Sequence, residues 1–515
     1  MSARFAMPKN AIIYYSTFIK LRKIPAVSRS KRRKKKERHK PLAKPFRARY
    51  TLAQIHENGE VILLVSEKTE LNRYVESLCA EVLDEYRIDP RYYEGDAVKR
   101  GLRNTDGTGV IAGVTRIGSV QGYYMRDMEK IAIPGELYYR GIPLDEIVDS
   151  HVSTGTFGYE EVAYLLLFGK LPTAEQLGRF NKILAASRRL PDGFFEDMIL
   201  KAPSKNIMNK LERSVLAMYS YDDRPDDTSL ENVMRQSIEL IGCFPTIVAD
   251  AYAVKRHAFD HHSLYVHNPK DHLSLSENFL RMCRWDKSYT PEEARLLDMM
   301  LIIHAEHGGG NNSAFACRTL TSSGTDTYSA IAAAVGALKG PLHGGANAKV
   351  QEMMRYIHEN VSDLNDANLR DYLAKILRRE AGDGSGKIYG LGHAVYTISD
   401  PRAEAIRKYA RKMADERGFS EEFDLTEAVV RVGIPLIREK IHRRLPMCAN
   451  VDLYSGLIYR MLGIPEDLFT PLFAIARIAG WCAHRLEELL TCRNIIRPAY
   501  RSSMEYTHFV PMEDR

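Results

Sequence analysis

The sequence lacks several features that mark special classes of protein. Its seven cysteines include no C-x-x-C pair, and this odd, scattered set argues against a disulfide framework and suits reduced thiols. No apolar run approaches the roughly 18–20 residues that a membrane-spanning helix needs. The best run, around 331–338, is short and rich in alanine. We find no internal repeat, and we predict a soluble, globular protein of the cytoplasm.

Acidic residues are almost absent from the first 50 positions, which hold 17 Lys or Arg and only one acid, Glu37. The remainder holds 56 basic and 65 acidic residues, so an acidic body follows a strongly basic tail. This division removes the main argument for nucleic-acid binding by the body. We expect the tail, 1–50, to be disordered. Three interpretations of it stay open: a solvated arm, an organelle transit peptide, and an arm that binds polyanions.

The remaining sequence predicts a mainly α fold with a small β part near its front. Residues 51–100 are weakly patterned and their structure is unclear. From Gly101 to Tyr139 the sequence is rich in glycine and β-branched residues, which favours short strands and hairpins. Helical patterns follow from about 346 to 361, from 420 to 445 and from 466 to 490.

A further helix begins at Thr290, a capping threonine followed by Pro291 at the first helical position and Glu293 three residues after the cap. Its glycine stop at 308–310 predicts that the helix ends there. The residues expected on its buried face are Leu296, Met300, Ile303 and His307.

Three common motifs are approached but not matched. His304 and His307 are three residues apart, whereas the zinc-protease helix needs two histidines four apart. Residues 382–387 resemble a phosphate-binding loop, but Ala381 replaces its first glycine and Ile388 follows its lysine. The glycines at 390 and 392 lack the third glycine of a dinucleotide fingerprint. We therefore predict no metal and no cofactor.

Four other segments place polar or ionisable residues beside glycines, where a backbone can approach a ligand closely. They read HAEHGGG at 304–310, GPLHGGAN at 340–347, GLGHAV followed by DPR at 390–402, and NVDLYSG at 450–456. In this order they resemble the citrate synthase family, and the resemblance runs from about Lys99 to Pro498. It implies a helical homodimer. Each chain would form a large domain from 101–342 and 457–515 and a small domain from 343–456.

The resemblance also implies an acyltransferase that condenses acetyl-CoA with oxaloacetate and water to give citrate and CoA. Asp452 would be the base, His343 would stabilise the enol or enolate, and His393 would polarise the oxaloacetate carbonyl. The residues implied for the oxaloacetate carboxylates are His307, Arg402, Arg477 and Arg497, the last contributed by the partner subunit. Candidates for the CoA phosphates are Lys440, Arg443 and Arg444, whereas Thr397 stands where many members carry Lys or Arg.

Local chemistry predicts different states for two of these histidines. His343 precedes Gly344, where a helix is expected to begin, and a helix N-terminus disfavours an imidazolium. A neutral donor at that position suits an enolate. His307 is expected at a helix C-terminus, where the dipole favours a cation, which suits binding of a dianion.

Three alternatives remain. A 2-methylcitrate synthase would use propionyl-CoA, and one extra methylene is worth only about 1–3 kcal/mol in a pocket. An inactive family member could serve as a binding subunit, although the intact His343, His393 and Asp452 argue against it. A structural protein on RNA or an anionic membrane would draw only on 1–50.

Overall fold

The computed structural model describes residues 72–515, apart from 77, 80–85, 96–97, 105, 128, 442–445 and 493. Residues Ile88–Arg515 form one compact unit, which carries every described residue of the site. The basic tail lies outside the described residues, so its disorder stays a prediction. The boundary between a large and a small domain at 342/343 also stays a prediction, because it falls within this unit.

A small antiparallel sheet opens the compact unit. Its strands are β1 (Gly118–Arg126), β2 (Glu129–Tyr139) and β3 (Ile142–Pro143), in the order β1-β2-β3. The β1–β2 hairpin pairs Gly118 with Tyr139 and Arg126 with Glu129, with an irregularity between Gln121 and Tyr123. The hairpin confirms the predicted β part. The observed strands β1 and β2 occupy only the second half of the predicted range 101–139.

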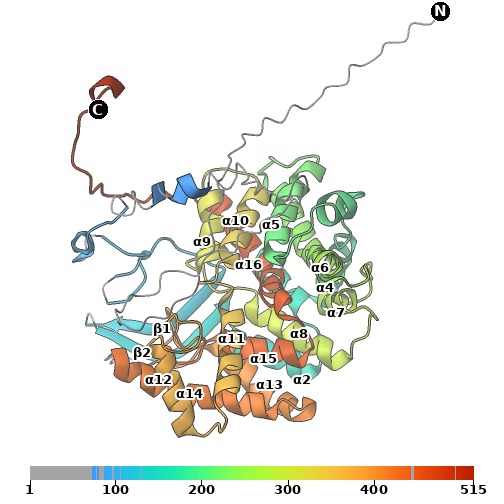
Figure 1. Ribbon diagram of the computed structural model, residues 1–515. Helices are drawn as coiled ribbons and strands as arrows, with labels where there is room; N and C mark the ends of the chain where they lie inside the picture. Colours follow the sequence, from blue (N-terminus) through green and yellow to red (C-terminus); the bar gives the residue numbers. More distant parts are fainter. Residues whose placement is uncertain are drawn as a thin grey trace, which may run out of the picture. The chain divides into compact units, whose positions relative to one another are not determined.

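The rest of the described chain is mainly helical, as predicted (Figure 1). The helices before the first site loop are α2 (Leu144–Thr154), α3 (Tyr159–Phe168), α4 (Ala174–Ala186), α5 (Ile207–Met218), α6 (Leu230–Asp260), α7 (Leu275–Cys283) and α8 (Pro291–His304). Those after it are α9 (Asn312–Thr321), α10 (Thr327–Lys339), α11 (Ala346–Asn360), α12 (Asp366–Leu377), α13 (Pro401–Arg417), α14 (Ser420–Ile441), α15 (Val451–Met461) and α16 (Phe469–Thr491). Short turns of helix are η1 (Pro90–Tyr93), η2 (Phe195–Leu200), η3 (Tyr219–Tyr221), η4 (Glu466–Leu468) and η5 (Met512–Asp514).

Helix α16 lies in the centre of the core, in contact with α3, α6, α8, α9 and α10. Its residue Trp481 is fully buried, and so is Arg477 one turn before it. A cation in such a position is costly unless it is paired or binds a ligand. The core therefore carries a charge that the packing of apolar side chains does not explain.

Helix α6 corrects the sequence-based expectation about apolar runs. Among the described residues it alone is long and apolar enough to cross a membrane, with a mean hydropathy of 1.4 over its best window. However, 89% of that window is buried inside the fold, as in a core helix. Glu239 and Asp250 stand inside this apolar stretch, so no run free of charged residues is long enough to reveal it in the sequence.

Two asparagine or aspartate caps fix the helices that carry site residues. The Asp400 side chain caps α13 by accepting from the Arg402 backbone N–H at 3.0 Å. The Asn450 side chain caps α15 by accepting from the Asp452 backbone N–H at 3.0 Å. Each cap satisfies a backbone donor that has no partner within its helix, and so fixes where the helix begins.

Candidate active site

The predicted site residues gather around two buried arginines, Arg402 and Arg477. Arg402 lies in the first turn of α13, and Arg477 lies inside α16. The positive charge of Arg402 contributes to the pKa shifts of four predicted site residues, which are His307, His343, His393 and Asp452. The structure therefore brings together six of the seven residues predicted for catalysis and oxaloacetate binding.

Arg402 is held by a carboxylate from its own helix cap. Oδ1 of Asp400 accepts from Nε of Arg402 at 3.0 Å, and Oδ2 accepts from Nη2 at 2.7 Å. Oδ2 of Asp400 also accepts from the Val451 backbone N–H at 3.3 Å, which links α13 to the start of α15. Burial alone would raise the pKa of Asp400, but Arg402 holds it below its ordinary value. This bidentate pair orients the arginine.

Arg477 has no such counter-ion on its outer nitrogens. Its Nε donates to the His304 carbonyl oxygen at 2.7 Å, whereas Nη1 and Nη2 are buried without a hydrogen-bond partner. Burial lowers the pKa of Arg477 to about 10, so the group stays charged at neutral pH. Nε2 of His307 is also buried and unpartnered. Because unsatisfied buried polar groups are costly and a guanidinium can only donate, these atoms indicate a site for an anion such as a carboxylate.

His307 differs from the sequence-based expectation in two ways. Helix α8 ends at His304, and Ala305 caps it, so His307 lies in the loop beyond the helix. Burial and the neighbouring Arg402 lower the pKa of His307 well below its ordinary value. This contradicts the predicted cationic state, because desolvation and a nearby guanidinium outweigh the field of the helix end.

The hydrogen bonds of His393 define its tautomer. Nδ1 accepts from the backbone N–H groups of Val395 at 3.1 Å and Tyr396 at 3.2 Å. Nη2 of Arg402 lies 3.5 Å from Nε2. The two shorter backbone contacts require Nδ1 to accept, so the proton of the neutral ring lies on Nε2. Burial and Arg402 lower the pKa of His393 to about 4, which keeps the ring neutral at pH 7. The ring stacks on Tyr396 at 4.6 Å between centroids and lies 5.2 Å from the ring of His307.

His343 lies in the loop between α10 and α11, and its Nε2 is 3.0 Å from Oγ of Ser313. Burial and Arg477 lower its pKa to about 4, in line with the predicted neutral ring. Ser313 Oγ also accepts from the Trp481 indole at 3.1 Å and lies 2.8 Å from the side-chain oxygen of Asn311. The serine hydrogen can therefore point to Asn311 or to His343.

Asp452 is the second residue of α15 and is half-buried beside Arg402. Burial is the largest influence on it and raises its pKa to about 6, although Arg402 opposes the shift. A carboxylate with this pKa is ionised at neutral pH and is more basic than an ordinary aspartate. Both properties suit a general base.

The residues predicted for the partner site and for CoA lie elsewhere. Arg497 is exposed and lies beyond the end of α16. The ammonium of Lys440 donates to the Leu377 carbonyl, and Arg443 and Arg444 lie outside the described residues. Thr397 is 2% exposed, so its side chain does not lie on a surface where it could face a phosphate. Its hydroxyl is buried without a hydrogen-bond partner.

Comparison with known proteins gives a match over most of the chain. Residues 104–499 match the model of the citrate synthase C-terminal domain. The chain belongs to the citrate synthase family. It is 36% identical over 389 residues to the citrate synthase of Deinococcus radiodurans, a match that covers 74% of this chain and 93% of that protein.

Two further members of the citrate synthase family illustrate the range of the match. The chain is 32% identical to the 2-methylcitrate synthase 1 of Corynebacterium glutamicum, covering 81% of this chain and 98% of that protein. The crystal structure of citrate synthase from Thermotoga maritima aligns with a TM-score of 0.63 and 30% identity. That alignment covers 81% of this chain and 99% of the Thermotoga chain, so the predicted mainly α citrate synthase fold is confirmed.

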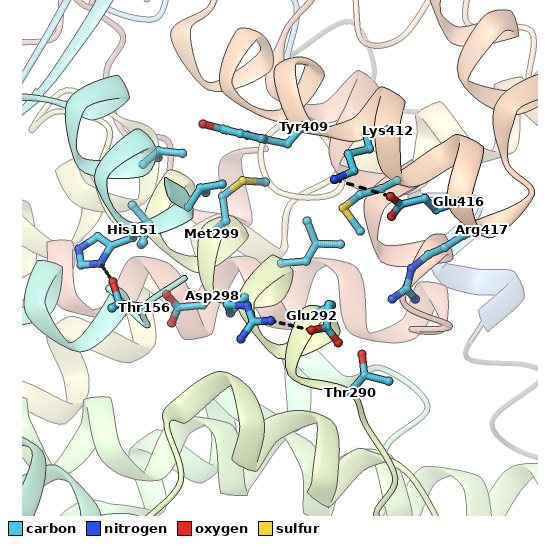
Figure 2. Close-up of a pocket in the computed structure, with 16 residues that line it drawn as sticks. His151, Thr156, Thr290, Glu292, Asp298, Met299, Tyr409, Lys412, Glu416 and Arg417 are labelled. Carbon is cyan, nitrogen blue, oxygen red and sulfur yellow. Dashed lines mark hydrogen bonds and ion pairs between the residues drawn. The ribbon is translucent and has the colours of Figure 1, made fainter. Parts of the chain in front are cut away.

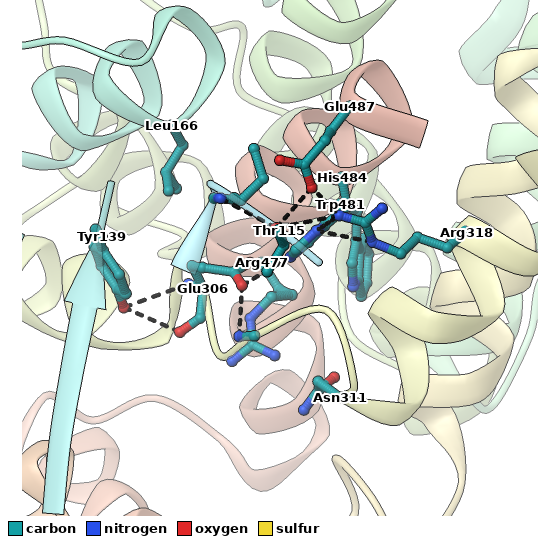
Figure 3. A network of polar contacts seen from close by, with 12 residues as sticks. Thr115, Tyr139, Leu166, Glu306, Asn311, Arg318, Arg477, Trp481, His484 and Glu487 are labelled. Carbon is teal, nitrogen blue, oxygen red and sulfur yellow. Dashed lines mark hydrogen bonds and ion pairs between the residues drawn. The ribbon is translucent and has the colours of Figure 1, made fainter. Parts of the chain in front are cut away.

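Several residues of this citrate synthase family site were not singled out from the sequence. Ser313 contacts His343, Tyr396 stacks on His393, and Glu306 belongs to the network of Figure 3 beside Arg477. Ser313 belongs to α9, and nothing in its surrounding sequence signals a contact 30 residues away. Glu306 directly precedes His307 within a quoted segment, and Tyr396 follows His393 by three residues, just past the segment 390–395. These positions were the available signal.

Two other features bear on the site. A cavity of about 560 Å³ lies between α2, α8 and α13, and none of the six clustered site residues lines it (Figure 2). Within the described part of the chain, no three His, Cys, Asp or Glu side chains are grouped closely enough to hold a metal ion. That the reaction needs no metal stays a prediction.

Proposed function

We propose that the protein condenses acetyl-CoA with oxaloacetate and water to give citrate and CoA. The observation that carries this proposal is a set of buried polar atoms without a partner, Nη1 and Nη2 of Arg477 and Nε2 of His307, beside the Nε2–H donor of His393. These groups suit a small anion that bears both carboxylates and a carbonyl. A carboxylate with a raised pKa, Asp452, lies in the same cluster.

Asp452 would take a proton from the methyl group next to the thioester, which forms the enol or enolate. His343 would stabilise the thioester oxygen by donating a hydrogen bond from Nδ1. That role requires the Ser313 hydroxyl to turn its hydrogen from Oδ1 of Asn311 to Nε2 of His343. The Asn311 amide would rotate at the same time, so that its nitrogen donates to the Ser313 oxygen. Trp481 already donates to the same hydroxyl. In this arrangement every atom of the serine hydroxyl is satisfied.

Oxaloacetate would be held by His307, Arg402 and Arg477, with Arg497 supplied by the partner subunit of a homodimer. Arginine suits carboxylates because its planar fork is permanently charged. Nε2–H of His393 would polarise the ketone as the enol carbon attacks it, and the ketone oxygen ends as a hydroxyl. The ketone oxygen gains one proton and Asp452 returns to solvent the one that it took from the methyl group, so the condensation itself neither consumes nor releases a proton. Water then hydrolyses the thioester, which releases CoA as the thiol.

One rival shares this mechanism, namely condensation of propionyl-CoA to 2-methylcitrate. The similarity to the 2-methylcitrate synthase 1 of Corynebacterium glutamicum supports this alternative. The two substrates differ by one methylene beside the reacting carbon, so the distinction rests on the space available there. A pocket discriminates one methylene by only about 1–3 kcal/mol of binding free energy. The residues described above serve either substrate.

The test is release of CoA thiol by the purified protein. We expect release from acetyl-CoA only when oxaloacetate is present, and we expect EDTA to leave the rate unchanged. Propionyl-CoA in the same assay decides between the two substrates through the ratio of kcat/KM values. Thiol release that needs no oxaloacetate, or that stops with the chelator, would contradict the proposal.

The pKa of Asp452 predicts how activity depends on pH. The base must be ionised, and its pKa is about 6, whereas His343 and His393 have pKa values of about 4 and stay neutral above that. We expect kcat/KM to be constant above neutral pH and to fall about tenfold per pH unit on the acid side of 6. The profile is measured at low substrate concentration in buffers of constant ionic strength.

The expected loss of activity at acid pH should not be caused by unfolding of the protein when Asp452 is protonated. Its folded-state pKa is raised above the ordinary aspartate value of 3.8, so protonation of this group favours the folded state as pH falls toward 4. Circular dichroism at pH 5 is the control and should match that at pH 7. An unchanged kcat/KM at pH 5 would show that Asp452 is not the base.

A further inference from the structure

A series of buried polar side chains, formed by Arg318, His484 and Glu306, lies beside Arg477 (Figure 3), and Glu306 directly precedes His307 in the sequence. Nε and Nη2 of Arg318 donate to Nδ1 of His484 at 3.1 and 2.7 Å. Nε2 of His484 lies 2.8 Å from Oε1 of Glu306. A guanidinium can only donate, so Nδ1 of His484 accepts and its Nε2–H donates to Glu306. Glu306 and His484 are fully buried, and Arg318 is nearly so.

The same carboxylate orders the loop that carries His307. Oε1 of Glu306 accepts from the Gly308 backbone N–H at 2.5 Å. Gly308 has a φ of +80°, a conformation that favours glycine. A Cβ at Gly309 would lie 3.2 Å from Nε of Arg318, so this loop also packs closely against Arg318. Glu306 is thus held from two sides, by His484 and by the loop.

Glu306 is also a neighbour of Arg477 without being its hydrogen-bond partner. A Cβ at Gly480 would lie 2.4 Å from Oε2 of Glu306 and 3.5 Å from Cδ of Arg477, so both side chains flank this glycine. Oε2 of Glu306 is buried without a hydrogen-bond partner, as are Nη1 and Nη2 of Arg477. A buried carboxylate and a buried guanidinium this close would ordinarily pair, because each is costly alone.

Two anchors account for the separation. Nε of Arg477 is fixed to the His304 carbonyl, which directs the outer nitrogens of the guanidinium. Oε1 of Glu306 is fixed by His484, which in turn is fixed by Arg318. Arg318 is itself anchored by Glu488, through Nη1 at 2.7 Å, and by Glu487. The carboxylate therefore has an alternative partner that keeps it from the arginine.

We propose that His484 is a positioning residue: it holds Glu306 away from Arg477, so that the outer nitrogens of Arg477 stay available for a substrate carboxylate. The inference deepens the proposed function and rests on its assignment of Arg477 to oxaloacetate. Without His484, the freed Glu306 carboxylate would pair with Arg477 and compete with the substrate. Glu306 would then act as an internal inhibitor of oxaloacetate binding.

The test is a double-mutant cycle read out as the Kd for oxaloacetate, measured by calorimetry without acyl-CoA. We expect His484→Leu to weaken oxaloacetate binding about tenfold or more, the size of a lost charge-assisted hydrogen bond. Adding Glu306→Gln to that variant should restore most of the affinity, because the amide does not form an ion pair with Arg477. Rescue by removal of a second buried group is not expected if His484 only stabilises the fold.

Two further variants cover the case in which His484→Leu does not fold. His484→Gln keeps a donor and an acceptor and should bind oxaloacetate within a few-fold of the unmodified protein. Glu306→Gln alone should bind it at least as tightly, because it removes a negative charge beside the substrate. His151→Leu is the matched control, since this histidine pairs with Glu161 outside the site and its loss should leave the Kd unchanged.

The outcomes separate this inference from the proposed function. An unmodified protein that does not bind oxaloacetate would contradict the proposed function itself. If the unmodified protein binds but Glu306→Gln weakens binding tenfold, Glu306 supports the substrate and the inference is wrong. The inference is equally wrong if His484→Leu folds and binds normally, or if it binds weakly and Glu306→Gln gives no recovery.

Discussion

Asp452→Asn is expected to lower kcat at least about 100-fold, in the range that positioned acid–base groups contribute. Asparagine keeps the shape of the side chain. The Asn450 cap accepts from the backbone N–H of residue 452, which the substitution does not change. The substitution therefore removes the proton acceptor and leaves the start of α15 intact. The measurement is thiol release at saturating oxaloacetate and acyl-CoA.

The matched control is Asp366→Asn, which alters an exposed aspartate in the first turn of α12. It should leave kcat unchanged. Oxaloacetate should still bind to Asp452→Asn, because the proposed carboxylate ligands are untouched. Near-normal turnover in Asp452→Asn, with circular dichroism unchanged, would remove the proposed base. His343→Ala and His393→Ala should also lower turnover about 100-fold or more, and His343→Ala should leave oxaloacetate binding nearly intact.

Local chemistry in the sequence was sufficient to predict some helix starts but not all helix ends. Thr290 and Pro291 begin α8 as predicted, because a cap and a proline act on the backbone next to them. The glycines at 308–310 suggested the wrong end, since α8 stops at His304. The loop beyond it is fixed by Tyr139, whose hydroxyl contacts the carbonyls of Ile302, Ile303 and Glu306. A contact from a distant strand leaves no trace in the local pattern.

The site itself was predicted in its members but not in its electrostatics. The quoted motifs named six residues that the fold places around Arg402 and Arg477. Their ionisation depends on burial and on those two charges, which only the packed structure provides. His307 shows the difference, because its helix position suggested a cation and its surroundings make it neutral.

The contacts behind the site could not be predicted at all. Arg318, His484 and Glu306 lie on α9, on α16 and in the loop after α8, and 178 residues separate Glu306 from His484. Taken singly, each is an ordinary charged residue of a helix or loop. Only the fold shows that these three side chains are linked by hydrogen bonds. Only the unpartnered atoms of Arg477 suggest that the linked side chains serve to keep Arg477 available for a substrate.

Mixed dimers provide the second large effect, and they test whether subunits share a site. Arg497 is exposed and lies 45 residues beyond Asp452, so in this proposal it acts in the partner's site. Arg497→Ala alone should weaken oxaloacetate binding roughly 10- to 100-fold without unfolding the protein, as expected for a lost charged hydrogen bond. When Asp452→Asn and Arg497→Ala subunits are mixed, each hybrid dimer has one site with both changes and one site with neither. Random exchange should then make about one quarter of all sites intact. Hybrid dimers that form, as native mass spectrometry would show, but recover no activity would place Arg497 outside the shared site.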